Sequence, residues 1–177
     1  MYYLYKTDVL SWGEERPIKL ENINYHNNLF KGRSHDAMVD VEVTLELSKK
    51  LRSYDQKMWA YLLSGFMKNN DKSRLKNLSK IIINNKEYMI GVYTDISLGY
   101  NSNCCCAVLS LGRHHIYSNQ TLWLRLDSTN IQENFEGQDS IPRVIKRKDG
   151  EPGFILPWKE SYKYVLGDER INNVTKN

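Results

Sequence analysis

Residues 37–47 form the most regular pattern in the chain, because apolar and mostly polar side chains alternate there without a break. One side carries Ala37, Val39, Val41, Val43, Leu45 and Leu47, and the other carries Met38, Asp40, Glu42, Thr44 and Glu46. A period of two with β-branched residues on the apolar side is typical of a half-buried strand. The pattern therefore predicts a strand that covers a core with one face and meets water with the other.

A helical signal follows this segment. Ser53 and Gln56 have the spacing of a capping box, which marks the start of a helix. Apolar residues then recur three or four positions apart, as on one face of a helix; they are Met58, Trp59, Leu62, Leu63, Phe66 and Met67. We expect an amphipathic helix of about four turns that ends near Asn69, followed by a shorter helix over residues 72–80.

Short strands dominate after residue 80. Residues 81–83 and 87–96 flank Asn84 and Asn85, which tolerate the positive φ of a tight hairpin. Further candidate strands cover residues 104–111, 121–126, 143–148, 154–156 and 162–166. Asp149 and Gly150 form a turn signal between two of them. The pattern predicts consecutive strands joined by short turns.

A helix followed by such strands indicates an α+β fold, with a mostly antiparallel sheet and one or two helices packed on one face. The length of 177 residues suits a single domain over residues 1–177. A hydrophobic content of 41% with a net charge of +4 excludes a disordered chain. Residues 11–35 carry no predicted element, and a loop of that length indicates either a functional segment or a missed element.

Positive charge is concentrated in two segments. Residues 48–90 contain ten Lys and Arg against three Asp and Glu, a net +7, and residues 141–177 contain eight against five, a net +3. Clustered cations bind polyanions by releasing counterions. The candidate nucleic-acid-binding residues are Lys49, Lys50, Arg52, Lys72, Arg74, Lys76 and Lys80 in the first segment, and Arg143, Lys146, Arg147 and Lys148 in the second. The alternative is that these are ordinary solvated surfaces.

The pattern Gly-Arg-x-His occurs twice, at residues 32–35 and 112–115. Arg holds phosphate oxygens, and His moves protons near neutral pH. Two imidazoles acting as base and acid can cleave RNA without a metal ion. The candidate catalytic residues are therefore Arg33, His35, Arg113 and His115. The alternative is that both histidines make ordinary loop hydrogen bonds.

Cys104, Cys105 and Cys106 have no Cys-x-x-Cys partner elsewhere, so we expect core packing rather than a zinc site. Glycine-rich phosphate loops and a serine nucleophile elbow are missing from the sequence. We expect no metal and no cofactor.

The leading functional hypothesis is an RNA- or ribonucleoprotein-directed accessory protein of a low-GC bacterium, its phage or its plasmid. In its sharper form, the hypothesis is a metal-independent ribonuclease. The alternative is a non-catalytic counter-defence inhibitor, similar to anti-CRISPR proteins, that binds a host nucleic-acid-processing protein. The sequence has no signal-peptide pattern and no apolar run of about 20 residues. We therefore expect a cytoplasmic protein with no membrane partner.

Overall fold

The computed structural model describes residues 8–12, 19–32, 36–99, 102–127 and 144–176. It confirms the α+β class with a six-stranded antiparallel sheet. Contacts within the chain divide it into two compact units, Met1–Leu63 and Ser64–Asn177. The single domain expected from length stays a prediction.

The first unit is helical. It contains α2 (Leu20–Asn27), α3 (Ala37–Tyr54) and most of α4 (Gln56–Ser64). α2 lies in residues 11–35, so this segment contained a missed element. Asn28 ends α2 in the left-handed conformation, with φ of 47°, which Asn tolerates better than most residues. Ile23 of α2 and Val43 of α3 are buried.

The strand predicted over residues 37–47 is wrong, because this segment lies within helix α3. The alternating positions include Val39, Val43 and Leu47, which are four residues apart and also share one face of a helix. Val43 is 2% exposed, whereas Val41 on the other side of the helix is 59% exposed. Asp36 caps the helix by accepting a 2.9 Å hydrogen bond from the Met38 N–H. The cap and the four-residue repeat outweigh the alternation.

The helix predicted from Ser53 to Asn69 is interrupted. Asp55, not Ser53, accepts the hydrogen bond from the Met58 N–H at the start of α4. Helix α4 ends at Ser64, and at the next residue, Gly65, a Cβ atom would lie only 2.6 Å from the Phe154 ring. The next helix is α5 (Lys68–Lys76), four residues earlier than the one predicted over residues 72–80.

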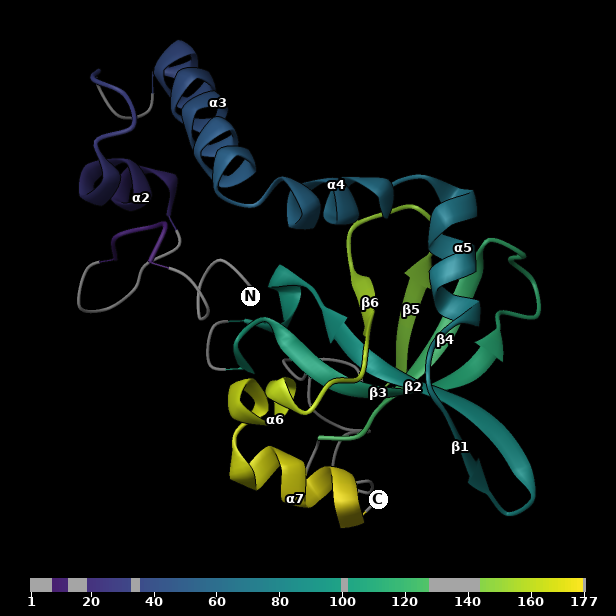
Figure 1. The fold of residues 1–177 in the computed structure, drawn as a ribbon. Coiled ribbons are helices and arrows are strands. Elements are labelled where there is room, and N and C mark those ends of the chain that lie inside the picture. Colours follow the sequence, from purple (N-terminus) through teal and green to yellow (C-terminus); the bar gives the residue numbers. More distant parts are fainter. Residues whose placement is uncertain (1–7, 13–18, 33–35, 100–101, 128–143, 177) are drawn as a thin grey trace. The chain divides into compact units, whose positions relative to one another are not determined.

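The second unit contains the sheet (Figure 1). Its strands are β1 (Lys80–Ile83), β2 (Lys86–Thr94), β3 (Cys105–Arg113), β4 (Gln120–Arg125), β5 (Val144–Lys148) and β6 (Phe154–Pro157). β1 to β5 follow one another across the sheet, and each neighbouring pair among them is antiparallel. Asn84 and Asn85 have φ of 48° and 60°, which confirms the predicted β1–β2 hairpin.

β6 does not pair with β5, although only residues 149–153 separate them. It pairs instead with β2, where Val92 lies opposite Leu156, on the side of β2 that β1 occupies farther along. A short link can join β5 to a strand beside β2 only if the sheet curls toward closure. The Asp149-Gly150 turn is confirmed, but it joins strands that are not neighbours in the sheet.

The core lies inside the curled sheet. Cys106, Val108 and Trp123 are completely buried there, with Leu75 and Leu78 from α5 and the chain after it. Cys105 and Ala107 point to the opposite side of β3 and are also 0% exposed. α6 (Ser161–Leu166) packs against β3, so helices cover the sheet on both sides (Figure 1). The core position predicted for the three cysteines is confirmed for Cys105 and Cys106, whereas Cys104 is only partly buried.

The strand predicted over residues 162–166 is wrong, because this segment forms α6. Val165 and Leu166 are buried next to each other, which a helix end against the sheet permits and a half-buried strand does not. α7 (Asp168–Lys176) follows and was not predicted. In the described part of the chain, every helix is too short or too polar to cross a membrane.

Candidate functional site

A buried ion pair links α5 to the end of β5. The Arg147 Nη2 atom lies 2.6 Å from both carboxylate oxygens of Asp71, and the Arg147 Nε atom donates to the Gly153 carbonyl at 2.6 Å. Gly150 N–H donates to the same Asp71 carboxylate. Arg147 is 1% exposed and Asp71 is 3% exposed. Arg147 therefore holds the turn after β5 against α5 and does not reach solvent.

Asp149 extends this buried cluster to the surface. Its side chain is 0% exposed, and its Oδ2 atom lies 3.3 Å from Arg113 Nη1 and 3.7 Å from Lys72 Nζ. Arg147 Nη1 lies 4.0 Å from the other oxygen, Oδ1. The side chains of Arg113 and Lys72 are 48% and 41% exposed. One buried carboxylate thus accepts a hydrogen bond from Arg113 and lies within ion-pair distance of Lys72, and both cations also face water.

The loop between β3 and β4, residues 114–119, lies next to these cations. The Asn119 carbonyl accepts from the Asp149 N–H at 2.9 Å, and Arg113 Nη1 donates to the Ser118 carbonyl at 2.7 Å. Gln120 of β4 also pairs with Lys148 of β5. We name the surface formed by Lys72, Arg113, Lys148 and residues 114–119 the basic end.

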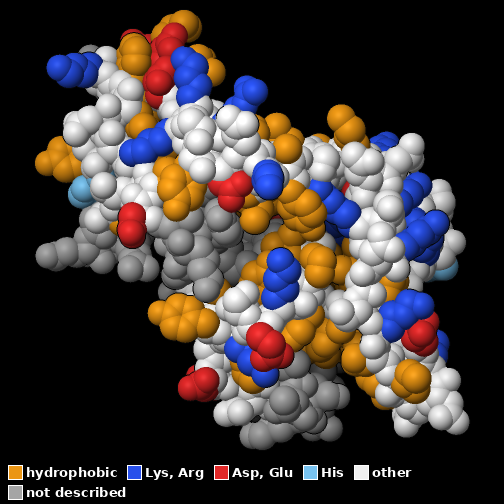
Figure 2. Space-filling view, viewed as in Figure 1, with side chains coloured by type: hydrophobic (Ala, Val, Ile, Leu, Met, Phe, Trp, Pro, Cys, Tyr) orange, Lys and Arg blue, Asp and Glu red, His pale blue; other side chains and the backbone are white. Residues whose placement is uncertain are grey.

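The basic end has an excess of positive charge. Arg113, Arg147 and Lys72 surround Asp71 and Asp149, so three cations face two carboxylates. Lys148 is half exposed and lies 3.4 Å from an exposed Glu151 oxygen. Figure 2 shows Lys and Arg side chains gathered over α5 and the neighbouring loop at the right of the view. This arrangement offers fixed positive groups to an anion.

Four other predicted cations lie in the second unit. Lys76 and Lys146 are exposed. Lys80 pairs with Glu87 at 2.7 Å in the β1–β2 hairpin, and Arg74 donates to the Ser64 hydroxyl. Lys80 and Arg74 are therefore held by partners other than Asp149.

Arg147 was predicted to bind nucleic acid, and its burial against Asp71 removes it from any exposed surface. Arg143 lies outside the described residues.

The predicted cations of the first unit lie on α3. Lys49 pairs with Glu46 one turn earlier at 2.7 Å, and this hydrogen bond raises the pKa of the Lys49 ammonium above its ordinary value. Lys50 donates to the Asn27 side chain at 3.1 Å, and Arg52 is exposed. The partner of Lys49 lies one turn earlier on α3, and the partner of Lys50 is a side chain of α2.

The predicted catalytic pairs are only partly described. Arg33 and His35 lie outside the described residues, so their meeting with Arg113 and His115 stays a prediction. Arg113 is engaged by Asp149 and the Ser118 carbonyl. His115 is exposed, and its ring stacks on His114 with centroids 4.8 Å apart and planes 12° apart.

The described residues contain no group of three His, Cys, Asp or Glu side chains that could hold a metal ion. Burial raises the pKa of the Cys106 thiol to about 12 and also raises that of Cys105. These thiols are packed in the protein interior and are poor nucleophiles.

Sequence reasoning missed two contributors to the basic end. Asp149 stands in the sequence only as part of a turn signal, although its carboxylate organises the site, and no local pattern singles out Asp71. Asp149 directly follows a predicted strand, and a polar residue at such a position is a weak signal for a functional site. Its partner Lys72 is far away in the sequence.

The comparisons with known proteins bear on the fold. No protein-family model matches the sequence, and no curated protein matches it. Among solved structures, the zinc-bound complex of Escherichia coli exonuclease I with single-stranded DNA matches 99% of this chain with a TM-score of 0.74 and 14% identity. The fold resembles part of exonuclease I.

Two further structures agree. Exonuclease I from Methylocaldum szegediense matches with a TM-score of 0.71 and 14% identity. The E. coli enzyme in complex with a dT13 oligonucleotide matches with a TM-score of 0.73 and 14% identity. Each match covers 99% of this chain. The chain spans about two fifths of the length of these exonucleases, which are covered to 41%, 41% and 42%.

Proposed function

We propose that this chain binds single-stranded nucleic acid at the basic end. The observation that carries the proposal is the buried Asp149 carboxylate, which forms ion pairs with Lys72 and Arg113 while both remain nearly half exposed. Cations that are already positioned lose little side-chain entropy when they bind a phosphate. The likeness to exonuclease I also supports binding of single-stranded nucleic acid, because several of those structures contain single-stranded DNA.

The more specific role predicted from the sequence, binding of RNA or a ribonucleoprotein, is part of this proposal. Phosphate contacts alone do not distinguish RNA from DNA, since both backbones carry the same charge. An RNA and a DNA strand of the same sequence and length separate the two forms. Tighter binding of the RNA strand supports the RNA-directed role, and equal or tighter binding of DNA overturns it.

The test of the proposal compares two variants with the same change in charge. Lys72→Gln with Lys148→Gln removes two cations of the basic end, and Lys49→Gln with Arg52→Gln removes two cations of α3. Binding of a fluorescent single strand is measured by anisotropy at several salt concentrations. The first variant should bind roughly tenfold more weakly at about 0.1 M salt, and its salt slope should fall by about 0.7 for each phosphate that is no longer neutralised.

The α3 variant should keep the wild-type affinity and slope. Equal weakening of both variants would show a diffuse electrostatic attraction and overturn the assignment to the basic end. Unfolding midpoints of both variants, measured in the same buffer, establish that the folded protein is being compared.

A further inference from the structure

The loop between β3 and β4 presents aromatic rings beside the fixed cations. Tyr117 is 53% exposed and His115 is exposed. His114 lies between them, stacked on His115 and tilted 46° against Tyr117 at a centroid distance of 5.1 Å. Three rings in contact at a loop tip bury little area against the core, so packing of the fold does not account for them.

Hydrogen bonds hold the His114 ring and the backbone of this loop in place, and the other two rings pack against His114. His114 Nδ1 accepts from the N–H groups of Ile116 and Tyr117 at 3.1 and 3.4 Å, which leaves the ring proton on Nε2. The ends of the loop are closed by hydrogen bonds from His114 N–H to the Gln120 carbonyl and from Gln120 N–H to the Tyr117 carbonyl. The rings are therefore part of an organised turn, and ordering them on binding costs little.

The position of this ring cluster indicates the class of ligand that fits it. Arg113 directly precedes the loop and donates to the Ser118 carbonyl within it, so a fixed guanidinium lies beside the rings. An aromatic ring next to a fixed cation matches one nucleotide unit, whose base stacks while its phosphate meets the cation. His114 stacks on one face of the His115 ring, and His115 is exposed. Bases in a duplex are already stacked on each other, whereas unpaired bases are free to stack on protein rings.

We propose that His115 and Tyr117 form a base-stacking platform for unpaired nucleotides. This inference rests on the proposed function and adds to it a requirement for bases, beyond the requirement for phosphates. Stacking of a base on an aromatic side chain contributes about 1–3 kcal/mol, which corresponds to roughly 5- to 150-fold in affinity.

The test uses an oligonucleotide with bases and an abasic oligonucleotide of the same length and charge. The wild-type chain should bind the strand with bases at least about fivefold more tightly than the abasic strand. His115→Ala and Tyr117→Ala should reduce this ratio toward one and leave the salt slope unchanged. His115→Phe and Tyr117→Phe retain a ring and should keep the ratio.

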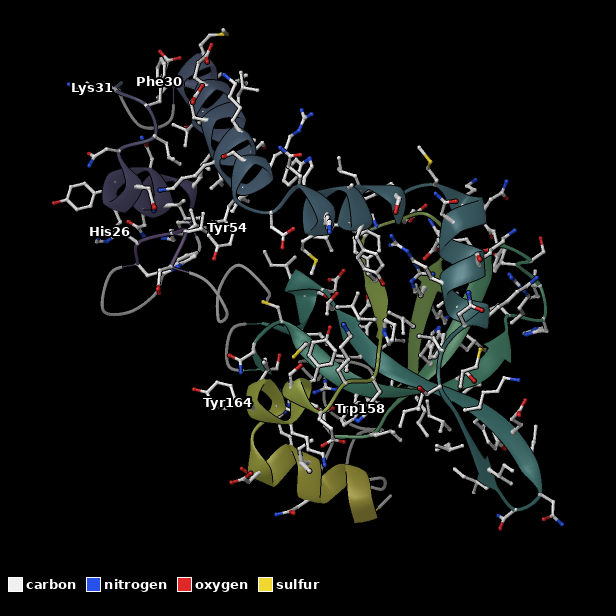
Figure 3. The ribbon with its side chains drawn as sticks, in the orientation of Figure 1. His26, Phe30, Lys31, Tyr54, Trp158 and Tyr164 are labelled. Atoms are coloured by element: carbon white, nitrogen blue, oxygen red, sulfur yellow. The ribbon has the colours of Figure 1, made fainter. Side chains whose placement is uncertain are left out.

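The matched control is Tyr164, a tyrosine of α6 that is 81% exposed and points away from the sheet (Figure 3). Tyr164→Ala should leave the ratio at the wild-type value. If Tyr164→Ala lowers it as much as Tyr117→Ala does, the platform is not the β3–β4 loop and the inference is overturned.

The remaining outcomes separate this inference from the proposed function. Salt-dependent binding that is equal for the two strands overturns the stacking platform and leaves the proposed function standing. Lack of binding to either strand overturns both.

Discussion

The two groups of basic residues in this chain are held in place by different means. On α3, Lys49 pairs with Glu46, and both side chains are more than a third exposed. At the basic end, Lys72 and Arg113 pair with Asp149, which is entirely buried. An exposed pair is screened by water and gains little from its geometry, whereas a buried carboxylate is fixed by the core. Burial of the counter-charge therefore decides how well a surface cation is positioned.

The largest expected effect concerns Arg147. Arg147→Met leaves the Asp71 carboxylate buried without its guanidinium, and breaking a buried pair in this way costs about 3–5 kcal/mol. The free energy of unfolding of the sheet unit should fall by that amount in urea denaturation. The matched control is Arg52→Met on α3, an exposed position where stability should hardly change. Similar losses in both variants would contradict the contrast between the two regions.

Alkaline pH should weaken the sheet unit. Burial raises the pKa of Cys106 from 9.0 to about 12 and that of Tyr93 from 10.0 to about 12. The unfolded chain ionises at the ordinary values while the folded chain keeps its protons, so stability is full below about pH 9 and falls between about pH 9 and 12. The slope should approach about 1.4 kcal/mol per pH unit for each ionising group.

Urea titrations at a series of pH values measure this slope. Cys106→Ala removes one of the groups with a raised pKa, so the stability of this variant should fall less steeply between about pH 9 and 10. An unchanged slope in that variant would exclude Cys106 as a source of the effect.

A smaller effect is expected at Arg170 of α7. Arg170 Nε lies 2.7 Å from the buried Asp127 carboxylate, and its Nη1 donates to the Ser102 carbonyl at 2.9 Å. Arg170→Ala should lower stability by roughly 2 kcal/mol, as for other hydrogen bonds to charged groups. If the variant shows faster hydrogen exchange than the wild type in α6 and α7 but not in β4, this guanidinium holds the two helices against the sheet. Uniform acceleration would contradict a local role.

The smallest expected effect tests the helical unit. Asp36→Ala removes the cap of α3 and should cost about 1 kcal/mol, visible as faster hydrogen exchange in the first turn of that helix. Asp36→Asn keeps an acceptor oxygen and should behave like the wild type. If α3 exchanges equally in all three proteins, the Asp36 contact does not stabilise it.

Sequence patterns predicted the sheet well where local chemistry decides the structure. The β1–β2 hairpin was located correctly because Asn84 and Asn85 accept the backbone angles of a tight turn. Residues 37–47 were mistaken for a strand because Val39, Val43 and Leu47 satisfy the period of a strand and that of a helix at once. Local periodicity cannot separate the two when every second position is apolar.

The candidate site was only partly accessible to the same reasoning. The sequence identified Arg113 and His115 as a local pair and Lys72 and Lys148 as members of basic clusters. It also placed Arg147 with the exposed cations. Arg147 is buried against the carboxylate of Asp71, which is 76 residues away in the sequence. No sequence pattern near Arg147 indicates this partner.

The sequence by itself determined the α+β class, the short antiparallel strands, the buried cysteines and the excess of positive charge, because each follows from residue types at nearby positions. Only the tertiary structure decided which cations face solvent and which are buried. That distinction depends on the fold, which brings α5, the end of β5 and the β3–β4 loop together around Asp149. Electrostatic attraction depends on distance and burial, and both are fixed only when remote segments meet.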